Sequence, residues 1–133
     1  MSLNKTDRYA VYRNLNNGML SVQSRGRKDY GKVIGHVRSI ALKDVSFVVR
    51  PAGRSKVLKE GVKNVHAFAV GHLLWNNPAL MGVYPLHLRL KDPDAEVYYN
   101  PYEVSTFVDR DTKKAVYTAR RVVLTCYRIQ VKY

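Results

Sequence analysis

Closely spaced arginine and lysine residues are the side chains in this sequence best suited to binding a ligand. The segment Arg25–Lys28 holds two arginines on either side of Gly26, and Lys32 follows shortly after it. Each guanidinium can form two parallel hydrogen bonds with a phosphate, and a glycine lets the backbone approach closely. Arg25, Arg27, Lys28 and Lys32 therefore predict a phosphate-binding loop, with a solvated hairpin loop as the alternative.

Two further groups of cations are predicted to contact phosphate. The first comprises Arg50, Arg54, Lys56, Lys59 and Lys63. Pro51 and Gly53 predict a loop with a short helical turn over 54–61, so these cations can converge on one end of the domain. The second group comprises Arg120, Arg121, Arg128 and Lys132 near the end of the sequence. For this second group, an edge strand protected by charge is the alternative.

Aromatic side chains beside these cations can stack on unpaired bases. The sequence has ten tyrosines. The alternation of a predicted strand places Tyr12 on the same face as Arg8. Tyr12 is therefore the candidate for stacking. Tyr98 and Tyr99 lie among acidic residues, which favours a structural role for both.

Histidine offers a weak candidate for catalysis. His66, in the segment Lys63–Phe68, could act as general acid or base in metal-independent RNA cleavage, with a nearby cation stabilising the phosphorane. A histidine in an apolar run is more often a core residue. His66 and His72 would lie about 20 Å apart along a strand, too far to share a metal. With no P-loop, zinc motif or dinucleotide fingerprint, the sequence predicts no metal or other cofactor and leans against an enzyme.

The apolar residues in the segments that must position these side chains mostly recur with a period of two, which is typical of β-strands. Asn17-Gly18 predicts a hairpin over 1–23. Further strands are predicted over 33–37, 45–50, 86–90, 97–99, 105–108 and 127–133, while 65–74 fits a strand or a short helix. Ile40 and Leu42 are expected on one face, and Val45 and Phe47 on another. The pattern predicts a single, mainly β domain over 1–133, of the β-dominated α+β class. Its expected architecture is an antiparallel sandwich or small barrel with at most one or two short helical segments.

The charge distribution narrows the class of partner. Residues 1–65 hold fourteen Lys/Arg and four acids, residues 66–111 three and six, and residues 112–133 six and none, which accounts for the net charge of +13. An excess of this size indicates a polyanionic partner, most often nucleic acid. The one cysteine, Cys126, lies in an apolar run and excludes an internal disulfide. No apolar run reaches the roughly 18 residues of a membrane span, so a soluble, reducing cytoplasmic setting is expected.

Several segments resemble small proteins encoded by bacteriophages and mobile elements. The resemblance is carried by Tyr12–Leu15, Arg50–Arg54, Lys63–Phe68, Tyr99–Tyr102 and Phe107–Asp109. It implies a phage accessory protein in the cytoplasm of an infected bacterium, and it implies no catalytic residues. Such proteins often interfere with host machinery, including defence systems.

Three hypotheses follow. The leading one is a non-enzymatic protein that binds RNA or DNA through a basic surface with little sequence specificity. The second is a counter-defence protein that inhibits a host nucleoprotein complex or sequesters a phosphorylated signal in a pocket lined by Arg and Tyr. The third is a small ribonuclease that uses His66. The leading hypothesis requires that cations distant in sequence meet on one surface.

Overall fold

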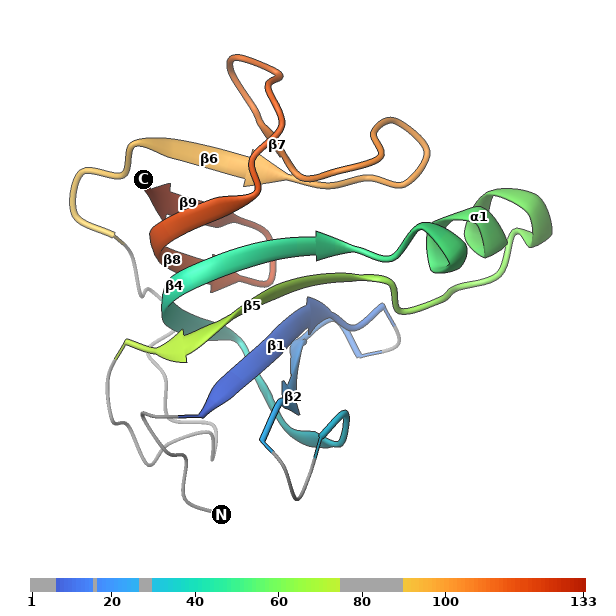
Figure 1. Ribbon diagram of the computed structural model, residues 1–133, viewed down its shortest axis with the longest axis horizontal. Helices are drawn as coiled ribbons and strands as arrows, with labels where there is room; N and C mark the ends of the chain where they lie inside the picture. The colour runs from blue at the N-terminus through green and yellow to red at the C-terminus, as the bar shows by residue number, and fades with distance from the viewer. Residues whose placement is uncertain (1–6, 16, 27–29, 75–89) are drawn as a thin grey trace.

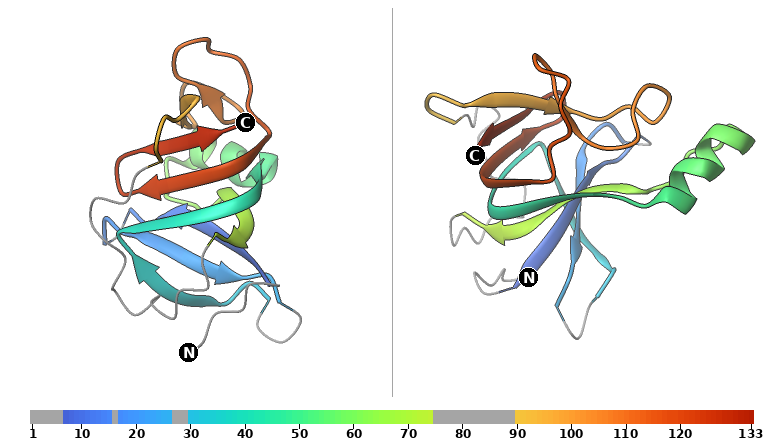
Figure 2. Two further views of the ribbon diagram at one scale, coloured as in Figure 1. Left: turned by 90° about the vertical axis from the view of Figure 1, so that its left-hand side faces the viewer. Right: turned by 45° about the horizontal axis from the view of Figure 1, so that its top comes forward.

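A curved antiparallel sheet forms most of the molecule in the computed structural model (Figures 1 and 2). The structure describes residues 7–15, 17–26, 30–74 and 90–133. The strands are β1 (Arg8–Arg13), β2 (Leu20–Ser24), β3 (Val33–Val37), β4 (Ser39–Val49), β5 (Ala67–Leu73), β6 (Ala95–Tyr98), β7 (Val108–Asp109), β8 (Thr118–Thr125) and β9 (Ile129–Lys132). Their order across the sheet is β3-β2-β1-β5-β4-β8-β9-β6-β7. The predicted β-dominated class is confirmed, with one sheet rather than two.

One face of the sheet wraps around the main core. Alternate residues of each strand point to this inner face, where buried Leu20, Leu42, Phe47, Leu73 and Val122 belong to one hydrophobic cluster. The predicted hairpin is confirmed, because β1 and β2 pair from Tyr9↔Ser24 to Arg13↔Leu20. The ambiguous run 65–74 is resolved as strand β5. The predicted strand over 86–90 falls mainly outside the described residues.

A bulge in β4 corrects the expected faces of that strand. Leu42 and Val45 both belong to the inner core, although a regular strand would turn them to opposite faces. Asp44 between them has a left-handed φ of 51°, and the pairing with β5 shifts register between Lys43 and Ser46. The extra residue turns the second half of β4 back toward the core.

Helix α1 (Pro51–Glu60) corrects the predicted loop over 54–61. It begins with proline at its first position, where the missing N–H costs nothing, and Gly61 ends it with a φ of 66°. Val57 is its only buried residue, so the apolar pattern was too sparse to predict ten helical residues. The helix projects from the end of the sheet (Figures 1 and 2).

Replacing Gly71 with alanine should destabilise the fold by about 2 kcal/mol or more. Gly71 lies opposite the β4 bulge, and a Cβ there would approach the Lys43 carbonyl oxygen to 2.8 Å and Val45 Cγ2 to 2.9 Å. Urea denaturation measures the free energy of unfolding. The control is Gly26→Ala, where the nearest atom is Ser24 Oγ at 3.4 Å. Equal stability of the two variants would contradict the close packing at the bulge.

Candidate functional site

The outer face of the sheet carries an aromatic ring that the main core does not cover. Strand alternation turns Phe68 of β5 away from the inner face, on which Ala69 lies. Phe68 forms a small separate cluster with Ala10 and Val70, yet only 1% of its surface is exposed. Polar and aromatic side chains must therefore bury this ring from outside.

Two arginines and two tyrosines surround Phe68, and we call these five residues the stack. The Arg25 guanidinium carbon lies 4.9 Å from the centroid of the Tyr30 ring and 5.3 Å from that of Phe68. The Arg50 guanidinium carbon lies 4.9 Å from the same Phe68 centroid. Tyr12 meets Phe68 edge to face at 5.7 Å between ring centroids. These cation–π contacts orient both guanidinium planes.

The stack brings together two predicted phosphate contacts that are 25 positions apart in the sequence. Arg25 lies after β2 and Arg50 after β4. Arg50 is the N-cap of α1 but makes no capping hydrogen bond there, and its guanidinium lies over Phe68 instead. With Arg25 half-buried and Arg50 exposed, part of each cation remains accessible.

The charges of the stack are not neutralised within the described part of the chain, where neither Arg25 nor Arg50 forms a salt bridge. Among the described residues, the Asp7 carboxylate lies close to this loop, because its Oδ2 would lie 3.7 Å from a Cβ placed on Gly26. Cation–π contacts leave the donors at a guanidinium edge able to bind an oxyanion. The stack therefore presents donors of the kind that bind an oxyanion.

Helix α1 and the residues after it carry further exposed cations. Lys56 and Lys59 are exposed on the helix, three positions apart, and Lys63 is exposed just after it. Residues at that spacing share one side of a helix. Arg50 immediately precedes the helix, so these lysines follow one arginine of the stack closely in the sequence.

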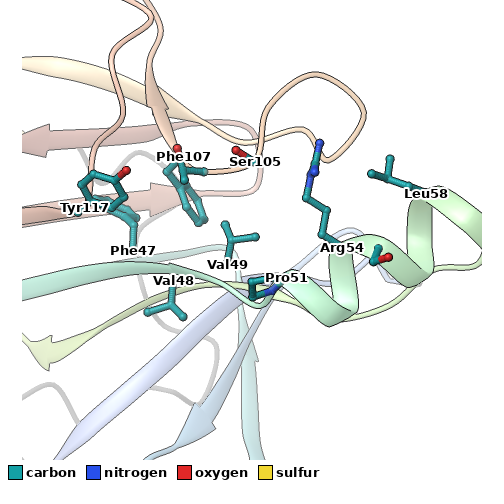
Figure 3. A pocket seen from close by; sticks show the side chains of 11 residues that line it. Phe47, Val48, Val49, Pro51, Arg54, Leu58, Ser105, Phe107 and Tyr117 are labelled. Atoms are coloured by element: carbon teal, nitrogen blue, oxygen red, sulfur yellow. The ribbon is translucent and has the colours of Figure 1, made fainter.

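Arg54 has a structural role instead. Its Nε donates to the carbonyl oxygens of Pro101 and Val104, both at 3.1 Å, and ties α1 to that loop. Beside it lies an apolar cleft of about 570 Å³ (Figure 3). The lining includes Phe47, Val49, Leu58, Phe107 and Tyr117.

His66 is buried with both ring nitrogens bonded inside the protein. Its Nδ1 lies 2.7 Å from the Asn64 carbonyl oxygen, which can only accept, so Nδ1 carries a proton. In the neutral ring, Nε2 then accepts from the Tyr99 hydroxyl at 2.7 Å. Burial raises the pKa of Tyr99, with Arg54 acting in the opposite direction, so the hydroxyl stays protonated at neutral pH. This arrangement favours a core histidine over a catalytic one.

The predicted C-terminal cations do not join the stack. Arg128 binds Glu96 at 2.9 Å and Lys132 binds Asp94 at 3.5 Å, so acidic neighbours offset both charges. The Nε of Arg120 donates to the main-chain oxygen of Tyr133. Arg121 is exposed on β8. Glu96 and Asp94 therefore offset the charges of Arg128 and Lys132 at the end of the sheet that contains β6 and β9.

The stability of the protein at alkaline pH should depend on the hydrogen bond between Tyr133 and Asp109. Burial and the hydrogen bond to Asp109 at 3.0 Å raise the pKa of Tyr133 to about 12. The pKa of an unfolded tyrosine is near 10, so the protonated Tyr133 hydroxyl stabilises the fold fully below pH 10. This contribution to the free energy of unfolding is lost as the pH rises through 12. Tyr133→Phe should lose less stability than the parent between pH 9 and 11.5 in urea titrations. The control is Tyr127→Phe, because Tyr127 is 90% exposed; identical alkaline losses in all three proteins would contradict the assignment.

Sequence reasoning missed two members of the stack. Phe68 lies in the run that fitted either a strand or a helix, and only its assignment to a strand places it opposite Ala67 and Ala69. Tyr30 had no distinguishing pattern. Arg27 and Lys28 lie outside the described residues, and Lys32 is exposed at the end of the loop. Across the described ranges, no group of three potential metal ligands gathers and no helix is long and apolar enough to cross a membrane.

Comparison with known proteins gives a viral context. A family model described as Mycobacterium phage L5 gene 82 protein matches residues 2–132. The gene 82 protein of Mycobacterium phage L5 is 35% identical over 128 residues, which cover 91% of this chain and 92% of that protein. No solved structure matches significantly. The resemblance to phage-encoded proteins predicted from the sequence is confirmed.

Proposed function

The chain belongs to the family of the Mycobacterium phage L5 gene 82 protein, and we propose that it binds RNA or DNA through the surface formed by the stack and helix α1. The observation that carries this proposal is the convergence of Arg25 and Arg50 on Phe68. The two cations come from distant segments and have no carboxylate partner in the described ranges. A surface built in this way suits a polyanion.

The chemistry of the surface supports binding without sequence specificity. Arginine and lysine bind phosphate oxygens, which every nucleotide presents, whereas reading a sequence needs contacts with base edges. Tyr30 lies against Arg25 and Tyr12 meets the ring of Phe68 edge to face, and both rings can offer surface to unpaired bases. The edge of the sheet at β6 and β7, where Asp94 and Glu96 offset neighbouring cations, would turn away from the ligand.

A salt titration tests the proposal. Binding of labelled oligonucleotides of several sequences, measured by fluorescence anisotropy, should weaken steeply between 50 and 200 mM salt. The affinity should change little with sequence. Binding weaker than micromolar at low salt, or binding that does not respond to salt, would overturn the proposal.

The apolar cleft favours a second candidate function. It contains Arg54 and Tyr117 beside two phenylalanines, and its volume lies within the range of about 300 to 1,000 Å³ typical of small-ligand sites. The Arg54 guanidinium keeps donors besides the Nε that holds the Pro101 and Val104 carbonyls, so this lining suits a nucleotide signal of the kind that a counter-defence protein would sequester. Stoichiometric binding of free nucleotides without affinity for oligonucleotides would favour this second function over the first.

A further inference from the structure

A row of basic residues crosses five neighbouring strands on the outer face of the sheet. Strand pairing places Arg8 opposite His72 and His72 opposite Lys43. Lys43 lies opposite Arg121, and Arg121 lies opposite Lys132. The strands concerned are β1, β5, β4, β8 and β9, which lie side by side (Figure 1). We call Arg8, His72, Lys43, Arg121 and Lys132 the basic row.

The basic row has no explanation in the stability of the sheet. Like charges directly opposite each other on paired strands are destabilising. Protection of a sheet edge does not account for them either, because β4 and β8 are interior strands and the edges are β3 and β7. Strands β8 and β9 both lie inside the sheet, so a charged edge strand, the alternative for the C-terminal cations, is wrong for Arg120, Arg121 and Lys132.

The basic row is narrow. On one side the pairing aligns uncharged Ala10, Val70, Ser46 and Thr118. On the other side, it aligns Ala41, Val123 and Gln130. At a strand spacing of about 4.8 Å, five strands extend the row over about 19 Å. The geometry is a line of basic side chains perpendicular to the strands, with its positive charge on Arg8, Lys43, Arg121 and Lys132.

Most of the basic row is available to a ligand. Arg8, Lys43 and Arg121 are exposed and form no salt bridge with any carboxylate in the described ranges. Lys132 at the end binds Asp94, and Asp44 follows Lys43 in the bulge. His72 donates from Nδ1 to the Asp7 carbonyl oxygen at 3.2 Å, which fixes its ring.

The basic row and the stack adjoin. The main-chain N–H of Arg25 donates to the carbonyl oxygen of Arg8 at 3.0 Å, so the first residue of the row contacts the loop that supplies the stack. Phe68 lies four residues before His72 on the same face of β5. Four residues of a strand span about 13 Å, so the rings lie to one side of the row and are reached from its Arg8 end through the Arg25 loop.

From this arrangement, we propose that the basic row binds the phosphodiester backbone of one nucleic-acid strand, which crosses the β-strands and directs its bases toward the stack. This inference rests on the proposed function and adds the path of the ligand. A line one residue wide contacts a single backbone, and rings beside it accept bases only if those bases are unpaired. A single strand is therefore the expected ligand, in preference to a duplex.

The test compares Lys43→Gln/Arg121→Gln with Lys113→Gln/Lys114→Gln. Both double variants remove two exposed positive charges, but Lys113 and Lys114 lie in the turn after β7, away from the basic row. The probes are a single-stranded DNA oligonucleotide and the duplex of the same sequence, titrated by anisotropy at several salt concentrations. Melting temperatures of the free proteins report on folding.

The basic-row variant should lower the salt-dependence slope for the single strand by about 1.4, and its affinity at 50 mM salt should fall at least tenfold. Its melting temperature should not fall, since opposed like charges are removed. The control should bind within about threefold of the parent, and the parent should prefer the single strand.

The two double variants could bind equally well while replacement of Arg25 and Arg50 abolishes binding. That result would overturn the proposed path of the nucleic-acid strand along the basic row and leave the proposed function intact. A parent preference for the duplex would also overturn it. If the parent binds neither probe, the proposed function fails as well.

Discussion

Replacing both Arg25 and Arg50 with glutamine should lower the affinity for nucleic acid about 100-fold at 50 mM salt. Each lost phosphate contact reduces the slope of log affinity against log salt by about 0.7 to 0.9. The loss of affinity is therefore largest at low salt. The substitutions remove the two guanidinium groups that meet over Phe68. Anisotropy titrations at several salt concentrations give both the affinity and the slope.

A matched control separates this site from net charge. Arg110→Gln/Arg128→Gln removes the same charge from two arginines that already contact Glu96. We expect this control to bind within a few-fold of the parent. An equal loss in both variants would show that the total charge, and not the stack, determines the affinity.

Lysine at the two positions separates charge from geometry. Arg25→Lys/Arg50→Lys keeps the charge but loses the planar fork that stacks on the ring and binds two phosphate oxygens. The salt slope should then stay close to that of the parent, while the affinity falls. Full retention of affinity would show that stacking contributes nothing to binding.

Replacing Phe68 with alanine should destabilise the protein by about 3 to 5 kcal/mol. The ring is 1% exposed and is among the largest fully buried side chains in the described residues. A domain of this kind has only about 5 to 15 kcal/mol of total stability, so the loss is a large fraction of it. Urea denaturation measures the change, and a loss below about 1 kcal/mol would contradict the burial.

Phe68→Leu tests the same ring in a protein that still folds. The leucine keeps an apolar side chain in the cluster, at a cost of about 1 kcal/mol, but removes the aromatic face under both guanidinium groups. The affinity for nucleic acid should fall several-fold. Phe107→Leu is the control, because Phe107 is buried in the inner core against Phe47 and Tyr99. If both variants bind like the parent, the stack does not position the arginines.

Local patterning was enough to predict most of the sheet. Alternation and Asn17-Gly18 predicted the β1–β2 hairpin, because side-chain direction and turn conformation depend on neighbouring residues. The same logic failed at β4, where one left-handed residue, Asp44, reverses the alternation. It also failed at α1, whose single buried residue leaves no helical apolar stripe.

The amino-acid sequence by itself determined the β-rich class, the excess of positive charge and the candidate cations, since these depend on composition and short spacing. Only the tertiary structure decided which cations act together. Strand pairing placed Lys43 opposite Arg121, brought Arg25 and Arg50 to one ring, and supplied Glu96 to Arg128. The physical reason is that the electrostatic energy of a charge depends on its neighbours in space. In this sheet, neighbouring strands are far apart in the sequence, so those neighbours come from distant segments.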